Sequence, residues 1–287
     1  MSDSTEHNWA LETFHYEYNK NWPMIIGAAL GIILNVIGFR MWRSKCYWPW
    51  LAPTAAGLLA TGYSARSFAQ KKEHILALHI ANNVLIVAPA VGLYCIFNYQ
   101  VWGKLMTAFT TGRGKYSLVK HDLAIRALAL ADIVSFTAQG GGAGLRATVD
   151  HQNTGRIIFL GGVISSNITY GLFVFLVVYS HRAFYLDSKY DKGTFPYLIY
   201  VALYLSSACI MFRTGYRFIE LIQGNDGKFV TEEKWLYMFD AIPMCIASLV
   251  YAVFFPGTLI QKAQDAADYS EIGMAAPRSE SRDQLYP

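Results

Sequence analysis

Apolar residues fall into long runs along this chain, separated by short stretches rich in charged and turn-forming residues. Each run is long enough for an α-helix to cross the hydrocarbon core of a bilayer, which takes about 20 residues. The pattern therefore predicts seven membrane-spanning helices. Their expected bounds are Trp22–Phe39, Tyr47–Phe68, Ile75–Tyr99, Asp122–Leu145, Ile157–Tyr179, Phe195–Ile222 and Trp235–Phe255.

The two ends of the chain are polar. Residues 1–21 contain no apolar core of the kind found in a cleavable signal peptide, so we expect the first span to act as its own insertion signal. Residues 261–287 are rich in Asp, Glu, Ser and Pro and are predicted to be disordered. We therefore expect a polar extracellular segment at 1–21, a membrane domain at 22–260 and a cytoplasmic tail at 261–287.

The distribution of Lys and Arg predicts the orientation. Seven spans place the two termini on opposite sides of the membrane. With the amino terminus outside, the cytoplasmic segments hold more Lys and Arg than the outer segments, as the positive-inside rule requires. The predicted fold is thus an all-α, seven-transmembrane helix bundle, integral and multi-pass, with its amino terminus outside and its carboxyl terminus cytoplasmic.

Composition agrees with a membrane protein and excludes other classes. The 287 residues are 54% hydrophobic and 15% charged, whereas soluble domains average about 25% charged residues. The net charge of +4 includes no dense basic cluster, so we expect no nucleic-acid partner. The four cysteines lie in or beside apolar runs, which favours buried free thiols over a disulfide framework.

The most informative polar residues lie in the sixth and seventh spans. At about 100° per residue, Arg213, Arg217 and Glu220 fall on one helix face, and Asp240 shares a face with Met244. A charge within an apolar helix costs about 2.5–3.5 kcal/mol even on the lenient insertion scale, so it usually points inward and finds a partner. We predict that this helical hairpin forms a polar seam, in which two arginines and two acids can pair.

The fourth span carries a second polar face, formed by Asp132, Ser135 and Gln139. An aspartate at mid-span with a glutamine two turns later is hard to explain as a lipid-facing surface. The glycine run at 140–142 either lets a neighbouring backbone approach closely or loosens the helix end, and close packing is the favoured interpretation.

Tyr63 and Arg66 share a helix face at the end of the second span. Arg66 either joins the polar interior or extends its guanidinium to the lipid headgroups. The sequence pattern leaves both alternatives open.

Motifs of common chemistries are missing from the sequence. It contains no GxxxxGK[ST] phosphate-binding loop, no HExxH, no GxSxG and no cysteine pair with zinc-ligand spacing. We expect no catalytic residue, no metal and no cofactor. The inward-facing polar groups would suit an amphipathic solute with a polar or cationic head and a long apolar tail. Alternatively, they pair only with each other to fix helix register; a structural pair is saturated, whereas a carrier leaves one charge free for its ligand.

Four motifs together resemble the fungal lipid-translocating exporter family, whose members include aminocholesterol-resistance and sphingoid long-chain-base resistance proteins. The resemblance covers spans two to seven. The motifs are D-x-x-S-x-x-x-Q followed by glycines (Asp132, Ser135, Gln139, Gly141, Gly142), R-x-x-x-R-x-x-E-x-x-x-G-x-x-G (Arg213, Arg217, Glu220, Gly224, Gly227), E-x-x-x-Y-x-x-D-x-x-x-M (Glu233, Tyr237, Asp240, Met244) and G-Y-x-x-R (Gly62, Tyr63, Arg66).

The resemblance implies seven spans and a role in moving amphipathic lipids or conferring resistance to them, and some family members are associated with porphyrin or haem passage. This chain departs from the family at Leu59, where members often carry an acid, and at Ser165 and Ser166, where a glutamine is frequent. Either change is compatible with a different substrate, so the assignment to sphingoid bases is an analogy with the family.

We therefore predict a transporter or efflux facilitator for amphipathic lipids, such as sphingoid long-chain bases or sterol-like compounds. We expect it in the plasma membrane, with the endoplasmic reticulum as the alternative. Asp132 and Glu220 would meet a cationic head, and Arg213 and Arg217 would meet a phosphate or keep the acids ionised. The full set of expected binding residues is Tyr63, Arg66, Asp132, Ser135, Gln139, Arg213, Arg217, Glu220, Tyr237 and Asp240.

Two other functions fit the same residues. A receptor-like lipid sensor would bind lipid without moving it, and would need a cytosolic partner for the loop Lys104–Lys120 or for the tail. A membrane-embedded isomerase or cyclase of a lipophilic intermediate would use Asp132 or Glu220 as its acid.

Overall fold

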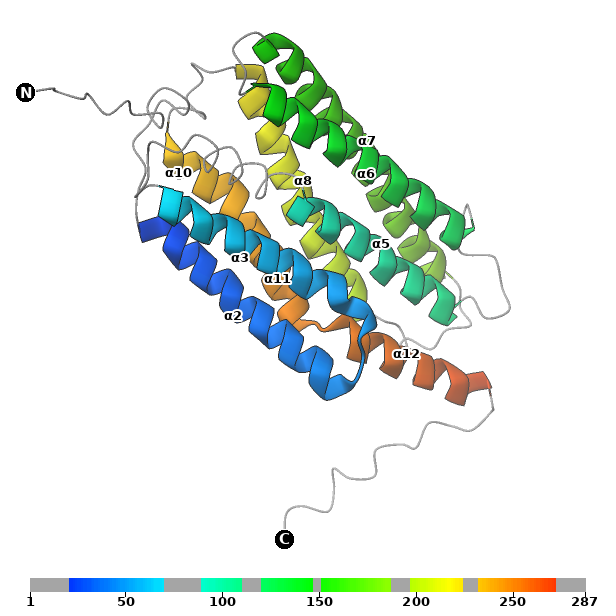
Figure 1. Ribbon diagram of the computed structural model, residues 1–287. Coiled ribbons are helices and arrows are strands. Elements are labelled where there is room, and N and C mark those ends of the chain that lie inside the picture. Colours follow the sequence, from blue (N-terminus) through cyan, green and yellow to red (C-terminus); the bar gives the residue numbers. More distant parts are fainter. Residues whose placement is uncertain are drawn as a thin grey trace, which may run out of the picture.

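The computed structural model describes residues 21–69, 89–109, 120–146, 151–186, 197–223 and 232–271. In these ranges every regular element is a helix (Figure 1). Their bounds are α2 Asn21–Ser44, η1 Trp48–Trp50, α3 Leu51–Ala69, α5 Pro89–Phe109, α6 His121–Arg146, α7 Gln152–Leu186, α8 Tyr197–Gln223, α10 Glu233–Leu236, the π-helical turn η3 Tyr237–Ala241, α11 Ile242–Val253 and α12 Pro256–Glu271.

Five helical segments of the described ranges are long and apolar enough to cross a membrane. They are Asn21–Ser44, His121–Leu145, Gln152–Leu186, Tyr197–Gln223 and Lys234–Val253. Large apolar side chains such as Ile32 and Phe175 point outward from these helices, as expected where the surroundings are lipid rather than water. The all-helical membrane architecture is confirmed, while the number of seven spans and the orientation stay predictions.

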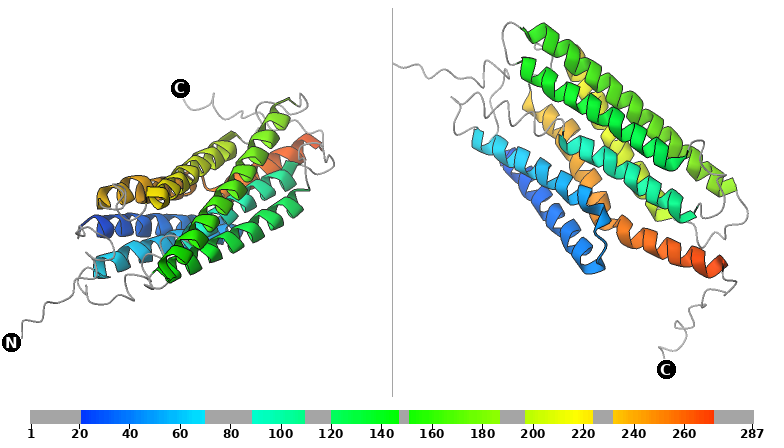
Figure 2. Two further views of the ribbon diagram at one scale, coloured as in Figure 1. Left: turned by 90° about the horizontal axis from the view of Figure 1, so that it is seen from above. Right: turned by 45° about the vertical axis from the view of Figure 1, so that its right-hand side comes forward.

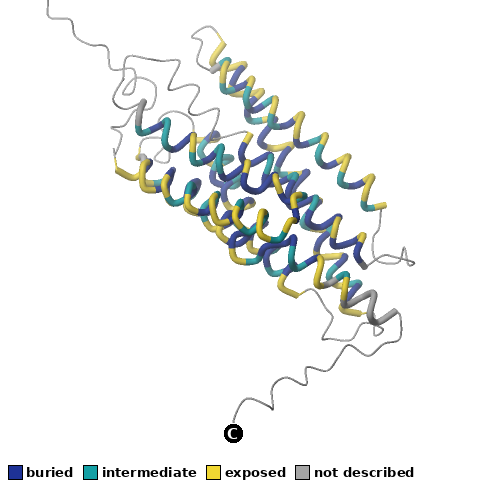
Figure 3. Tube along the Cα trace, turned by 60° about the horizontal axis from the view of Figure 1, so that its bottom comes forward, coloured by how far each residue is buried: buried dark blue, intermediate teal, exposed yellow. Residues whose placement is uncertain are grey.

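The helices form an elongated bundle in which most run close to one long axis (Figures 1 and 2). Helix α2 packs along α3 on one side, and α6 packs along α7 on the other. Helices α5, α8 and α11 lie between these two pairs. Helix α5 contacts both pairs, α8 packs on α7, and α11 packs on α2, α3 and α8. Buried residues follow the inner faces of the helices and exposed residues follow the outer faces (Figure 3).

Aromatic rings fill much of the interior between the two pairs. The ring of Phe173 meets that of Tyr99 edge-on, with centroids 4.6 Å apart, and Phe97 meets Tyr251 in the same way at 4.8 Å. Such edge-to-face pairs stabilise a core beyond the area that they bury. Because several rings carry a hydroxyl, the core also needs internal hydrogen-bond partners.

Helices α6 and α7 approach each other closely through two glycines. A Cβ atom on Gly142 would lie 2.6 Å from the backbone nitrogen of Phe159, and one on Gly162 would lie 2.7 Å from the carbonyl oxygen of Ser135. The favoured interpretation of the glycine run is therefore confirmed at Gly142. Its neighbours at 140 and 141 have nothing within 4 Å of the corresponding position.

The helix of the predicted third span continues beyond its expected end at Tyr99. Helix α5 continues past Tyr99 to Phe109, because most of the segment that follows Tyr99 is itself buried, including Trp102 and Leu105. As described, α5 begins at Pro89, and residues 75–88 of the predicted span lie outside the described residues.

The predicted start of the disordered tail is wrong. Helix α12 runs through residue 261 to Glu271. Its first turns are tied to the bundle through Ile260, which is buried, and Leu259, which packs against the core, while the alanines that follow favour a helix. Residues 272–287 of the predicted tail lie outside the described residues.

Candidate functional site

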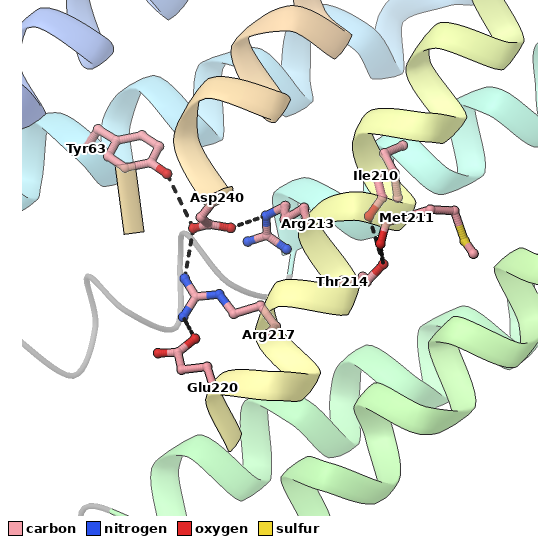
Figure 4. Close-up of polar contacts among 8 residues, drawn as sticks. All are labelled: Tyr63, Ile210, Met211, Arg213, Thr214, Arg217, Glu220 and Asp240. Carbon is pink, nitrogen blue, oxygen red and sulfur yellow. Dashed lines mark hydrogen bonds and ion pairs between the residues drawn. The ribbon is translucent and has the colours of Figure 1, made fainter. Parts of the chain in front are cut away.

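Two arginines of α8 converge on one carboxylate, that of Asp240 in η3 (Figure 4). Arg213 Nε forms an ion pair with Asp240 Oδ1, and Arg217 Nη2 donates to Asp240 Oδ2 at 2.8 Å. Arg217 Nη1 donates to Glu220 Oε2 at 2.9 Å. The hydroxyl of Tyr63, on α3, lies 3.4 Å from Asp240 Oδ2. We call Arg213, Arg217, Glu220 and Asp240 the ion network.

The ion network balances its own charge. Its two arginines and two acids sum to zero, and its inner pair is shielded from solvent: the side chain of Asp240 is 0% exposed and that of Arg213 2%. Charges buried this deeply are tolerated only when paired and hydrogen-bonded. Glu220 lies at the rim, with 21% of its side chain exposed. The prediction that these arginines and acids pair is confirmed.

The π-helical turn gives Asp240 its position. A π turn inserts an additional residue into the helical repeat and is often found at functional sites. Pro243 follows this turn and has no N–H to donate to the carbonyl of Phe239, so the regular hydrogen-bond pattern is already interrupted here. The sequence contained this signal, although spacing alone did not reveal that the helix changes its repeat.

Asp132, on α6, is separate from the ion network. Its side chain is 0% exposed, and its Oδ2 accepts a hydrogen bond of 2.6 Å from the hydroxyl of Tyr99, on α5. Its Oδ1 is buried and accepts no hydrogen bond from any described residue. Cys95, also on α5, is in electrostatic contact with both Asp132 and Arg213.

The other two polar residues of this α6 face, Ser135 and Gln139, form hydrogen bonds with α7. Ser135 Oγ donates to the Ala131 carbonyl at 2.8 Å and lies 2.9 Å from Ser165 Oγ, on α7. Gln139 Nε2 lies 3.2 Å from both the carbonyl oxygen of Gly162 and the hydroxyl of Ser166. These contacts hold α6 against α7. Asp132 differs from Ser135 and Gln139 because its Oδ1 is buried without a hydrogen-bond donor among the described residues.

Arg66 and Tyr237 both lie inside the bundle. Arg66 is buried, which excludes the alternative that it extends to the headgroups. Tyr237, in η3, is buried as well, and its ring stacks on that of Trp22 at 6.4 Å. Tyr63 links α3 to the ion network through its hydroxyl, and Tyr237 belongs to the same turn, η3, as Asp240.

Asn98, on α5, joins four helices and was not singled out by the sequence pattern. Its Nδ2 donates to the hydroxyl of Tyr170 at 2.6 Å and to Ser206 Oγ at 3.2 Å, and its Oδ1 accepts from the hydroxyl of Tyr251. These partners lie on α7, α8 and α11. An amide within an apolar run was the available signal, since buried amides need several partners.

An open apolar groove of about 410 Å³ runs between α5 and α6. Its lining residues are Pro89, Gly92, Leu93, Ile96, Ile133, Phe136, Thr137 and Gly140. Ile96 precedes Tyr99 by about one turn, and Phe136 follows Asp132 by about one turn. The groove and the Asp132–Tyr99 pair therefore occupy neighbouring turns of the same two helices.

Metal binding finds no support in the described ranges, where no three His, Cys, Asp or Glu side chains gather at a single point. The arrangement provides instead a neutral ion network, one carboxylate oxygen without a donor, and an apolar groove.

Residues 54–263 match the family model described as RTA1 like protein. The chain belongs to this family. It is 30% identical to Protein RTM1 of Saccharomyces cerevisiae over 196 residues, which cover 67% of this chain and 62% of that protein. It is 27% identical to Protoporphyrin uptake protein 1 of the same species over 200 residues, or 68% of this chain and 64% of that protein.

This member of the RTA1 like family is also similar, over a longer stretch of sequence, to the protein named Sphingoid long-chain base transporter RSB1 of Saccharomyces cerevisiae. The two are 23% identical over 279 residues, which cover 83% of this chain and 71% of the relative. No solved structure matches. The chain spans less than two thirds of the length of Protein RTM1 and Protoporphyrin uptake protein 1. The resemblance inferred from the four motifs is confirmed at the level of the family.

Proposed function

We propose that this protein moves amphipathic lipids with a polar or cationic head through the membrane, as a transporter or efflux facilitator, and so confers resistance to them. The name of RSB1, a sphingoid long-chain base transporter, supports this class of substrate for a relative. Export of such lipids would take place at the plasma membrane, with the endoplasmic reticulum as the alternative.

The observation that carries the proposal is the pairing of Asp132 with the groove. A long-chain base has an ammonium head and a long apolar tail, and each needs a different surface. The free Oδ1 of Asp132 offers an acceptor for the head, and the groove between α5 and α6 offers apolar contacts for the tail. Because the ion network already satisfies its own charges, we assign the head first to Asp132.

Glu220 is the second proposed contact for the head, since it is the most exposed acid of the ion network. Arg217, itself paired with Asp240, would hold Glu220 in place, and Arg213 and Arg217 would meet the phosphate of an anionic head group. The residues that shape the surroundings in this proposal are Tyr63, Arg66, Ser135, Gln139 and Tyr237.

Reconstitution into liposomes tests this proposal. A fluorescent long-chain base is added to one leaflet, and its movement to the other is followed by chemical quenching. We expect Asp132→Asn and Glu220→Gln each to slow this movement, since each removes a negative charge with little change of shape. Asp122→Asn is the matched control, because that acid lies on the same helix as Asp132 with 77% of its side chain exposed.

Movement by the wild-type protein no faster than in empty liposomes would refute the proposal. Equal rates for wild type, Asp132→Asn and Glu220→Gln would refute the assigned residues. Mass analysis of the recovered lipid separates transport from the enzymatic alternative, because a transporter returns its substrate unchanged.

A further inference from the structure

Two buried aspartates in this protein have opposite environments. Asp240 faces two guanidinium groups and a tyrosine hydroxyl. Asp132 accepts one hydrogen bond from Tyr99, and no arginine or lysine of the described ranges forms an ion pair with it. Both side chains are fully shielded from solvent. The same chemical group is thus neutralised at one position and left without a counter-charge at the other.

A carboxylate ion in such surroundings is strongly unfavourable, because burial removes its hydration and nothing replaces it. A proton or a bound cation relieves this cost. Ionisable residues inside membrane bundles commonly serve as proton relays for the same reason. Asp132 is therefore stable in two forms: a neutral carboxyl group that carries a proton, and a carboxylate paired with a bound cation.

We infer that Asp132 couples transport to protons by exchanging a bound proton for the cationic head of the substrate. This inference rests on the proposed function and adds the source of energy. With no substrate, the carboxyl group carries the proton on one oxygen while Tyr99 donates to the other. When the ammonium head arrives, the O–H bond breaks, the proton leaves to water on one side, and the carboxylate pairs with the ammonium.

The exchange keeps the site neutral in both states. One positive charge enters as one proton leaves, so the bundle never encloses an uncompensated carboxylate. One proton then moves for each cationic head, in the opposite direction. A proton gradient would thereby drive accumulation of the lipid on the acidic side.

The titratable and charged groups around Asp132 are either paired with another residue or are not acids, so Asp132 is the residue that exchanges the proton. On α5 it faces Tyr99 and Cys95, and the ring of Tyr170, on α7, lies 6.2 Å from that of Tyr99. On α8, Arg213 is also in electrostatic contact with Cys95, but is paired with Asp240. Asp240, the acid that pairs with Arg213, is already neutralised by two arginines and so does not compete for the proton.

Transport measurements provide the first test. Liposomes containing the wild-type protein and a pH-sensitive dye receive a fluorescent long-chain base. We expect an imposed proton gradient to raise accumulation of the base several-fold and the dye to report proton movement on addition of the base. Asp132→Asn cannot release a proton, so both responses should disappear, while Asp122→Asn should keep both.

Infrared difference spectroscopy provides a second test that needs no transport. Dodecylamine, a simple cationic amphiphile, is added to the purified protein, with neutral dodecanol as the control. We expect dodecylamine to remove a protonated-carboxyl band and create a carboxylate band in wild type and in Asp122→Asn. We expect no such change with dodecanol, or with dodecylamine in Asp132→Asn. Thermal unfolding of each variant shows that the fold is retained.

The outcomes separate the two proposals. Movement of the base by wild type that is indifferent to the proton gradient, or driven by a sodium gradient instead, overturns proton exchange and leaves the proposed function standing. Absence of movement refutes the proposed function, and the infrared result then decides whether Asp132 still exchanges a proton for an amine. A wild-type spectrum without the carboxyl band overturns the inference in either case.

Discussion

Replacing Asp240 with asparagine removes the carboxylate that Arg213 and Arg217 share. The ion network then changes from neutral to a net charge of +1, because Glu220 is the only acid left in it. Arg213 loses its ion-pair partner while its side chain stays 2% exposed. The buried guanidinium is thus left without this compensation, although the shape of the side chain at position 240 barely changes.

Removing one partner of a buried ion pair costs about 3–5 kcal/mol, because the other charge stays buried. We expect Asp240→Asn to lie in the upper half of this range, since two arginines lose the same partner. Glu220→Gln serves as the matched comparison. That acid makes one contact, with Arg217, at the rim of the network, so we expect its loss to cost about 1 kcal/mol.

Equilibrium unfolding in mixed detergent, followed by tryptophan fluorescence, measures both costs. The double variant Asp240→Leu with Arg213→Met removes both members of the inner pair, and we expect it to recover much of the lost stability, as apolar replacements of buried pairs often do. Equal losses for Asp240→Asn and Glu220→Gln would show that burial does not set the energetics of the network. A double variant less stable than Asp240→Asn would show that the charge of Arg213 is not the source of the cost.

Two other contacts give predictions with internal controls. Gly142→Ala places a methyl group against the backbone of Phe159, so we expect it to lower the free energy of unfolding by about 1–3 kcal/mol. Gly141→Ala is the control, because its methyl group meets nothing within 4 Å and should be neutral or stabilising. The same unfolding measurement compares the two variants, and equal effects would contradict the close approach of α6 and α7. Asn98→Leu leaves buried hydroxyls on three helices without their common partner, so we expect it to cost about 1–3 kcal/mol of stability. Asn35→Leu is the control and should cost under about 1 kcal/mol, because the exposed amide of Asn35 bonds only within its own helix. Similar unfolding midpoints for the two variants would show that Asn98 does not hold the helices together.

Helix positions and inward faces were accessible from the sequence because both follow from local rules. The apolar runs give spans of the right length, and the 3.6-residue repeat places Arg213 and Arg217 on the same face. The cost of a buried charge then predicts that they pair with acids, and the structure confirms it. Each of these steps needs only the residues of one segment and the chemistry of the bilayer.

The isolation of Asp132 was not accessible in this way. Periodicity shows that Asp132 shares a face with Ser135 and Gln139, but not which helix packs against that face. In the structure α7 satisfies the serine and the glutamine, whereas α5 gives Asp132 a single tyrosine hydroxyl. The difference depends on the packing of three helices, which no spacing along one of them encodes. Likewise, the continuation of α12 depends on contacts of Ile260 with the bundle.

The ion network also has a consequence for biogenesis. During synthesis the ribosome delivers Arg213 and Arg217 before Asp240, so α8 enters the membrane before its main counter-charge exists. Until η3 and α11 are synthesised, a guanidinium without its carboxylate is costly in lipid, and this cost favours retention of α8 at the translocon. A nascent chain that stops short of Asp240 would therefore present an orphan charge to the membrane, a mark by which cellular quality control can distinguish unfinished copies from complete ones.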